Sequence, residues 1–306
     1  MKISNGLKSN FFLFLAAVIW GFAFVAQCVA EEVDIFLIIA TRYLLGSVAL
    51  LPIIFFFEDK NEKREGIHPK FFTTVKYSAL CGTVLFIASA LQQYGISINP
   101  NAGKAGFITG TYTVMVPIFY LLFFRKKTGT NVIFGAVSAV FGLYLLSVTD
   151  GFGSIEISDI VLFIGAIFWT FHIILIDNCI NKVSPIKFSS LQFLMCSALS
   201  FIAMLVISNL SVTDMIFHTK QAIIPILYMG VFSSGIGYTS QALGQKNASP
   251  TYAAIILSLE SVFAAIGGVI FGIDDSMTFR KYVGCAFIFV GIIISQLNFK
   301  NKKRTS

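Results

Sequence analysis

Four ionisable side chains lie inside long apolar stretches of this sequence: Arg42, Lys104, His172 and Glu260. Such groups are costly inside a lipid bilayer, so they usually face a cavity or pair with another polar group, and each is a functional hypothesis. Glu260 lies near the middle of its stretch. A carboxylate at that depth can bind a proton or the cationic group of a solute, or it can pair with a basic side chain of another helix.

The other three groups have simpler alternatives. Arg42 lies near enough to one end of its stretch for its guanidinium to reach the membrane surface. Lys104 opens its stretch, where a lysine can anchor a helix, although Gly103 and Gly106 beside it would let a solute or another helix approach closely. His172 could carry protons, or it could be held by a hydrogen-bonding neighbour inside the protein.

Two amides and two indoles occupy matching places in the chain. Gln92 and Gln241 are separated by 149 positions, and so are Trp20 and Trp169. An amide offers hydrogen-bond donors and acceptors without charge, which suits a polar solute. We therefore expect the two glutamines to lie on opposite walls of a central crevice. The two indoles could stack against a ligand there. Interhelical hydrogen bonding of the amides and simple packing of the indoles are the alternatives.

These matches belong to a repeat of about half the chain. Residues 14–22 return as residues 163–171, and Gly135 and Gly142 return as Gly284 and Gly291. A half-length repeat is typical of a duplicated architecture. In membrane proteins it is typical of secondary transporters, whose sites lie at the repeat interface near the middle of the bilayer.

The composition makes lipid the main solvent of the chain. Of 306 residues, 56% are hydrophobic and only 12% are charged, against about 25% charged in average soluble domains. A span of the ~30 Å hydrocarbon core takes about 20 apolar residues. The sequence predicts an all-α polytopic membrane protein with ten spans, near residues 11–30, 35–57, 72–94, 102–124, 131–149, 158–178, 187–209, 221–245, 250–273 and 279–299.

The distribution of lysine and arginine predicts the orientation. Of the 22 lysines and arginines, all but five fall on the side of the N-terminus, and the exceptions are Arg42, Lys104, Lys220, Arg280 and Lys281. This bias predicts that both termini are cytoplasmic in the plasma (inner) membrane. Because each half would contain five helices, an odd number, residues 1–150 and 151–306 should form two inverted five-helix repeats.

Several other classes of protein and site are disfavoured. The net charge of +7 lies in short loops, where it sets topology and can contact lipid headgroups, so nucleic acid is not an expected partner. Five cysteines without a C-x-x-C pair favour packing over a disulfide or metal site. The sequence contains no Walker A loop, so ATP is not an expected energy source, and no cofactor is expected.

Two segments resemble a known family. Residues 105–117, AGFITGTYTVMVP, and residues 249–265, SPTYAAIILSLESVFAA, resemble the fourth and ninth helices of EamA-type transporters of the drug/metabolite transporter superfamily. The Trp20 and Trp169 motifs are similar to the start of each EamA repeat. Ser261 stands where the family usually has proline, and Asp274-Asp275 replaces its usual glutamate. The resemblance implies ten helices, inverted repeats, and export or exchange of amino acids or other small metabolites through a cavity that would include Trp20, Gln92, Tyr112, Trp169, Gln241 and Glu260.

The resulting hypothesis is a secondary transporter that works by alternating access, with protons as a candidate coupling ion and the oligomeric state left open. Its candidate substrate-binding residues are Trp20, Gln92, Tyr112, Trp169, His172, Gln241 and Glu260. Two alternatives belong to other classes. A polytopic enzyme acting on lipid-linked substrates would need catalytic residues clustered near one face, and a channel or structural partner would show no saturable, proton-dependent flux.

Overall fold

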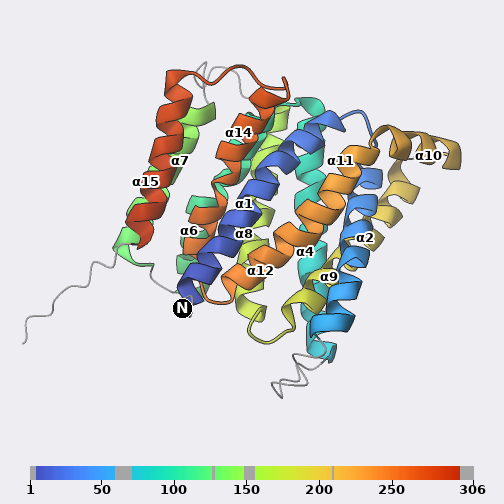
Figure 1. Ribbon diagram of the computed structural model, residues 1–306, viewed down its shortest axis with the longest axis horizontal. Coiled ribbons are helices and arrows are strands. Elements are labelled where there is room, and N and C mark those ends of the chain that lie inside the picture. Colours follow the sequence, from blue (N-terminus) through green and yellow to red (C-terminus); the bar gives the residue numbers. More distant parts are fainter. Residues whose placement is uncertain (1–4, 59–70, 126–127, 148–155, 209, 297–306) are drawn as a thin grey trace, which may run out of the picture.

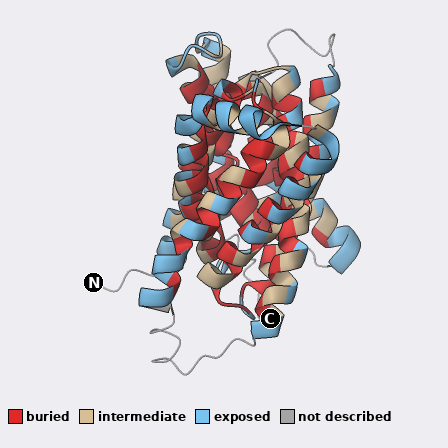
Figure 2. Ribbon diagram, turned by 90° about the vertical axis from the view of Figure 1, so that its right-hand side faces the viewer, coloured by how far each residue is buried: buried red, intermediate tan, exposed pale blue. Residues whose placement is uncertain are grey.

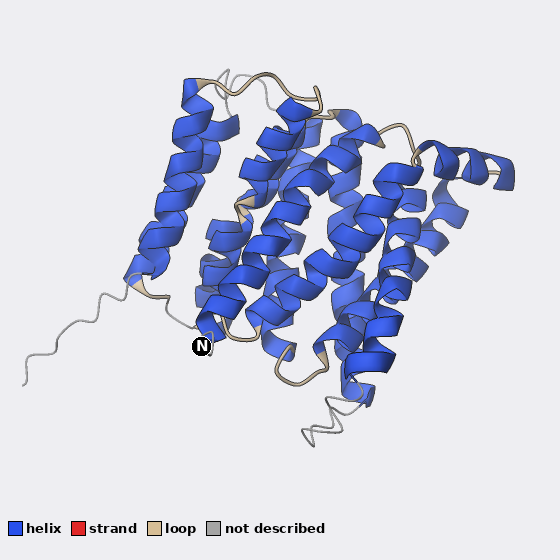
Figure 3. Cartoon of the chain, in the orientation of Figure 1, coloured by secondary structure: helices blue, strands red, loops and turns tan. Residues whose placement is uncertain are grey.

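The protein is described here by a computed structural model that covers residues 5–58, 71–125, 128–147, 156–208 and 210–296. Every regular element in these ranges is a helix (Figure 3). The helices run side by side in one bundle, with α7 and α15 at its left edge in Figure 1. The expectation of an all-helical chain is confirmed for the described residues.

The first half of the chain contains four continuous helices, a π-helical extension and a further helix in two pieces. In order, its elements are α1 (Asn5–Val29), α2 (Ile35–Ile53), η1 (Ile54–Glu58), α4 (Phe71–Ile98), α5 (Ala102–Gly110), α6 (Tyr112–Phe124) and α7 (Thr130–Ser147).

The second half repeats this order with two differences. The short helix α10, which contains no buried residue, is added, and three consecutive elements take the place of the single helix α4. Its elements are α8 (Ile157–Cys179), α9 (Pro185–Ala203), η2 (Met204–Ser208), α10 (Val212–Gln221), α11 (Ile223–Leu227), η3 (Tyr228–Tyr238), α12 (Thr239–Gln245), α13 (Pro250–Leu257), α14 (Glu260–Ile270) and α15 (Phe279–Gln296).

Eight helical stretches in the described chain are long and apolar enough to cross a membrane. They correspond to eight of the ten predicted spans. The remaining two predictions, residues 131–149 and 279–299, overlap α7 and α15, which have 18 residues each and are not among the eight. The multi-spanning fold is therefore confirmed, whereas the count of ten spans stays a prediction.

Apolar side chains cover the outside of the bundle, and several amides are buried within its mostly apolar interior. Phe72 and Phe279 are 79% and 83% exposed, while Gln93 and Gln192 are fully buried. Figure 2 shows the buried residues along the centre of the bundle. In lipid, apolar side chains can face outward, whereas polar groups must find their hydrogen-bond partners inside the protein. This distribution is therefore typical of a membrane-embedded bundle.

Two spans are broken in their middle. Between α5 and α6, the Thr111 N–H bonds to the Ile108 carbonyl at 3.2 Å, and between α13 and α14, the Leu259 N–H bonds to the Ile256 carbonyl at 3.1 Å. Both are tight bonds to the third residue back, which interrupt the α-helical ladder. The second break forms although residue 261 is serine, and the first precedes Pro117 by six positions. Tyr112 and Glu260 therefore begin the second pieces.

Glycines allow α7 and α15 to touch at backbone distance. A Cβ built on Gly135 would lie 2.6 Å from the Gly291 carbonyl oxygen, and one built on Gly142 would lie 2.5 Å from that of Gly284. The repeat matches Gly135 with Gly284 and Gly142 with Gly291. Gly135 therefore contacts the repeat partner of Gly142, and Gly142 contacts the repeat partner of Gly135. A two-fold axis generates such a reciprocal pattern.

Candidate functional site

A small polar cavity lies between the two halves of the bundle. Its wall is formed by α1, α2, α4, α5, α6, α8, η3, α12 and α14, and its volume is about 40 Å³. That space holds a few water molecules, whereas ligand pockets usually measure about 300–1,000 Å³. The cavity in this conformation is therefore too small for a ligand of the usual size.

Six of the seven predicted site residues line this cavity together: Trp20, Gln92, Tyr112, Trp169, Gln241 and Glu260. His172 is behind the wall. It is fully buried, its ring lies 5.8 Å from that of Trp169, and its Nε2 lies 3.1 Å from the Gln192 Oε1. His172 therefore lies inside the protein beside a hydrogen-bonding neighbour, as one of the two hypotheses for this residue predicts.

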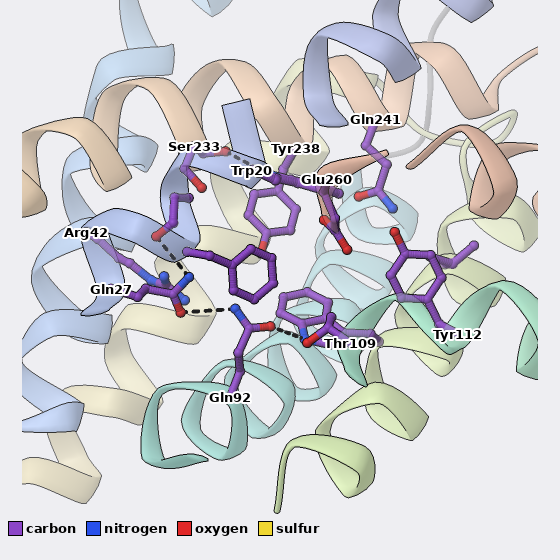
Figure 4. A pocket seen from close by; sticks show the side chains of 14 residues that line it. Trp20, Gln27, Arg42, Gln92, Thr109, Tyr112, Ser233, Tyr238, Gln241 and Glu260 are labelled. Carbon is purple, nitrogen blue, oxygen red and sulfur yellow. Dashed lines mark hydrogen bonds between the residues drawn. The ribbon is translucent and has the colours of Figure 1, made fainter. Parts of the chain in front are cut away.

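A chain of hydrogen bonds crosses the cavity wall and joins the two halves. The Trp169 indole N–H donates to the Gln92 Oε1 at 2.7 Å, the Gln92 amide donates to the Gln27 Oε1 at 3.0 Å, and the Gln27 amide donates to the Ala23 carbonyl at 3.2 Å. These partners lie on α8, α4 and α1 (Figure 4). Gln92 is thus engaged with the protein, as the interhelical alternative predicts.

Gln241, which the repeat matches with Gln92, has a side-chain oxygen without a hydrogen-bond partner among the described residues. Gln241 is 1% exposed, yet its Oε1 has no hydrogen-bond partner in the described chain. The same is true of the Tyr112 hydroxyl and of one Glu260 oxygen, Oε1. Figure 4 shows these three side chains on one side of the cavity, with the Tyr112 hydroxyl beside the Glu260 carboxyl group. Unpaired buried polar atoms are rare, so this wall offers free groups to water or a ligand.

Arg42 is a cavity residue, which the sequence left undecided. It is 3% exposed and does not reach the membrane surface. Its guanidinium donates to the Tyr43 hydroxyl at 3.3 Å and lies 3.6 Å from the Met229 sulfur, and its Nε has no partner. None of these contacts is with a carboxylate, so its charge is not balanced by an adjacent anion.

Aromatic rings form another part of the wall. Tyr238 lies at 4.6 Å from Trp20 and 6.1 Å from Trp169 between ring centroids, and its hydroxyl is 3.0 Å from that of Tyr43. The Tyr43 hydroxyl also lies 2.8 Å from the Ser89 hydroxyl. Sequence reasoning missed Tyr238 because no charge or repeated residue type marks it.

Lys104 lies outside the cavity. Its ammonium forms ion pairs of 3.2 Å with Glu156 and 2.8 Å with Asp159, at the start of α8. Asn99 donates to the same Glu156 carboxylate. The hydrogen bonds from Asn99 and Lys104 hold the pKa of Glu156 below its ordinary value. Lys104 thus connects the two halves at one end of the bundle, in keeping with an anchoring role.

Asp274 makes a second connection at that end. Its carboxylate accepts hydrogen bonds from the backbone N–H groups of Ala102 (3.0 Å) and Gly103 (2.7 Å), at the first turn of α5. Burial raises the pKa of this carboxyl group above its ordinary value. The acidic residue that follows α14 therefore caps a helix of the other half, because the first turn of a helix has free N–H groups.

No group of three His, Cys, Asp or Glu side chains within the described ranges could hold a metal ion. What the cavity does offer is a guanidinium, a carboxyl group, unpaired amide and hydroxyl oxygens, and aromatic faces. Together with the membrane-spanning bundle, these features define a polytopic membrane protein with a buried cavity between two similar halves.

Comparison with known proteins gives the family. The EamA-like transporter family matches residues 7–148 and again residues 156–297. The chain belongs to this family, which is part of the drug/metabolite transporter superfamily. The resemblance noted in the sequence is thereby confirmed.

Individual relatives share about a quarter of their aligned residues with this chain. An uncharacterized transporter of Archaeoglobus fulgidus is 26% identical over 95% of this chain and 86% of its own length. The uncharacterized transporter YwfM of Bacillus subtilis is 25% identical over 93% of this chain and 92% of its own. A WAT1-related protein of Arabidopsis thaliana is 25% identical over 84% of this chain and 77% of its own.

A solved crystal structure has a similar fold. It superposes with a TM-score of 0.72 at 16% identity and covers 94% of this chain and 98% of its own. At that identity the likeness concerns the fold alone.

Proposed function

We propose that this protein is a secondary transporter that moves small metabolites, amino acids or related compounds, by alternating access as an exporter or exchanger. The observation that carries the proposal is the cavity itself. Matched residues of the two halves, Trp20 with Trp169 and Gln92 with Gln241, meet around one buried space. A site at the interface of repeats near the middle of the bilayer is what alternating access requires.

The contact between α7 and α15 supports an inverted pair of repeats, residues 1–150 and 151–306. The reciprocal glycine contacts fit a two-fold axis, and the order in which they occur makes the two helices antiparallel. In addition, the start of α8 lies beside the end of α4, where Asn99 meets Glu156. Two halves related in this way can open a crevice to either side of the membrane in turn.

The broken helices support a role for Glu260 in coupling. Glu260 is the first residue of α14, the second piece of a broken span, and is 3% exposed. No lysine or arginine in the described chain forms an ion pair with its carboxyl group. A buried carboxylate without a cation is costly. We therefore propose that Glu260 takes up a proton or a cationic group during each cycle, which would couple the flux to a gradient.

The proposed location is the plasma membrane, with both termini in the cytoplasm. The excess of lysine and arginine in the loops of one side supports this orientation. Figure 1 also shows that α1 begins and α15 ends at the same end of the bundle. The proposed partners are a small-molecule substrate, protons and the surrounding lipids.

Counterflow in proteoliposomes tests the proposal. Vesicles holding the purified protein are preloaded with pools of unlabelled amino acids, nucleobases or organic acids, and uptake of a labelled trace of each pool is followed. A transporter gives a saturable, transient accumulation with one pool, and empty vesicles give none. Non-saturating flux would indicate a channel, and absence of flux from folded protein with every pool would contradict transport of these metabolites.

A membrane enzyme acting on lipid-linked substrates is the rival function. It would require acid, base or nucleophile side chains gathered where a lipid headgroup can reach. The described residues place Glu260 and Arg42 in a cavity of about 40 Å³ between the halves and place His172 behind its wall. This arrangement favours transport.

A further inference from the structure

We propose that the substrate is a zwitterion whose anionic group binds Arg42 and whose cationic group binds Glu260. This inference rests on the proposed function, because it names the substrate class of the same cavity. It also assigns Arg42, rather than the paired amides alone, as the residue that selects a carboxylate. The argument rests on two buried groups, a guanidinium and a carboxyl group, that line opposite sides of one cavity without forming an ion pair with each other.

The first is the guanidinium of Arg42. It is 97% buried, and its polar neighbours are a hydroxyl and a thioether, both uncharged. The Tyr43 ring lies 4.7 Å beneath its central carbon, which fixes the planar group while leaving Nε without a hydrogen bond. A planar fork of donors held in this way is suited to a carboxylate, which can accept two parallel hydrogen bonds from it.

The second is the carboxyl group of Glu260. It is also 97% buried, and its Oε1 has no hydrogen-bond partner. Around it are uncharged groups, the Tyr112 hydroxyl and the unpaired Gln241 amide oxygen (Figure 4). Three oxygen atoms that face a common space form a suitable receptor for an ammonium group, which carries three donors.

The two charges do not form an ion pair with each other. Neither Arg42 nor Glu260 forms an ion pair of 4.0 Å or less with a residue of the described chain, so the two groups are farther apart than that limit. Figure 4 shows them on opposite sides of the cavity, with Tyr238 between them. Each charge therefore remains available to a ligand that enters between them.

This arrangement discriminates by charge. A purely cationic solute would satisfy Glu260 but would bring a like charge near Arg42, and a purely anionic solute would do the reverse beside Glu260. A zwitterion satisfies both groups and adds no net charge to the buried site. Its carbon skeleton would pack on the rings of Trp20 and Tyr238, which lie between the two charges.

Tryptophan fluorescence gives a direct test, because Trp20 and Trp169 are the two tryptophans of the chain and both line the cavity. The purified protein is titrated with each common amino acid, with its methyl ester, which keeps only the positive charge, and with its N-acetyl derivative, which keeps only the negative charge. We expect a saturable change with at least one amino acid, and dissociation constants at least about tenfold higher for its two derivatives, the loss of one charged hydrogen bond.

Variants assign the two charges. Arg42→Gln should weaken binding of the amino acid at least about tenfold while leaving the methyl ester unchanged, and Glu260→Gln should leave the N-acetyl derivative unchanged. Lys182→Gln is the matched control, because Lys182 also lies over a tyrosine ring, that of Tyr77, outside the cavity. It should alter none of the three dissociation constants. If Arg42→Gln fails to fold, Arg42→Lys replaces it. The comparison of the three compounds on the unaltered protein also still tests whether binding requires both charges of the ligand.

Three results would overturn the inference: an ester or N-acetyl derivative that binds as tightly as its amino acid, no binding of any amino acid, or equal effects of Arg42→Gln on all three compounds. Its failure differs from failure of the proposed function. Saturable counterflow of a singly charged or uncharged solute would retain transport and remove the zwitterion. Charge-selective binding without counterflow would retain the zwitterion and remove transport.

Discussion

The indole N–H of Trp169 donates a 2.7 Å hydrogen bond to the side-chain oxygen of Gln92. The two residues come from different halves of the chain, and each has a counterpart at the matching position of the other half. Those counterparts, Trp20 and Gln241, do not bond to each other: Trp20 donates to the Ser233 carbonyl at 3.2 Å. The two-fold pattern of the sequence is therefore broken at the cavity, where one amide is engaged and the other is free.

This difference gives a prediction for the two glutamines. Gln92→Leu leaves the buried Trp169 N–H without its acceptor, and we expect the free energy of unfolding to fall by about 1–3 kcal/mol. Gln241→Leu removes an amide whose oxygen is unpaired, so stability should change little while substrate affinity falls. Thermal unfolding in detergent, followed by circular dichroism, measures the first effect. Equal losses of stability in both variants would contradict this assignment.

Glu260 should be needed for coupling. Glu260→Gln keeps the shape of the side chain but removes its ionisable group, so gradient-driven accumulation should be abolished. Exchange at saturating substrate should persist, because exchange requires no net movement of protons. Proteoliposomes with and without an imposed pH gradient measure both quantities on one preparation. Driven flux equal to that of the unaltered protein would remove Glu260 from the coupling mechanism.

The contact between α7 and α15 should not tolerate a methyl group. Gly142→Ala would place its Cβ about 2.5 Å from the Gly284 carbonyl oxygen, and overpacking of this kind costs about 1–3 kcal/mol. Gly6→Ala is the control, since nothing lies within 4 Å of a Cβ there and alanine favours the helix by up to about 1 kcal/mol. Unfolding temperatures compare the two. A Gly142→Ala protein as stable as Gly6→Ala would contradict the close approach.

The ion pair at the start of α8 should make a contribution that depends on pH. Asn99 and Lys104 hold the pKa of Glu156 below its ordinary value of 4.5. A folded pKa below the unfolded one stabilises the protein above the unfolded value, and the contribution is lost as the pH falls through the folded value. Glu156→Gln should therefore lower the melting temperature at pH 7 and have no effect well below pH 4.5. Because Glu156 is exposed to solvent, added salt should reduce the difference.

Topology can be tested with fusions. An alkaline phosphatase reporter, active only outside the cytoplasm, should be active when fused after residue 154 and inactive when fused after residue 128. The reason is the concentration of lysine and arginine in the loops on the side of residue 128. A reporter that is active in the cytoplasm should give the opposite pattern at both positions. Reversed activities would overturn the predicted orientation.

The sequence alone determined the solvent, the helical class, the family and six of the fourteen residues that line the cavity. These follow from local properties: apolar runs of the length of a bilayer, and a repeat that pairs Trp20 with Trp169 and Gln92 with Gln241. The depth of Glu260 in an apolar stretch was enough to mark it as a candidate, because a carboxylate in lipid is costly and is therefore a functional hypothesis.

Only the tertiary structure decided which of these groups is free. The burial of Arg42, the capping of α5 by Asp274, and the position of Tyr238 between two indoles depend on which helix packs against which. The same holds for His172, which its contact with Gln192 places behind the wall. A hydrogen bond between residues 77 positions apart, such as that of Trp169 with Gln92, depends on how the helices pack, and no periodicity along the chain encodes it.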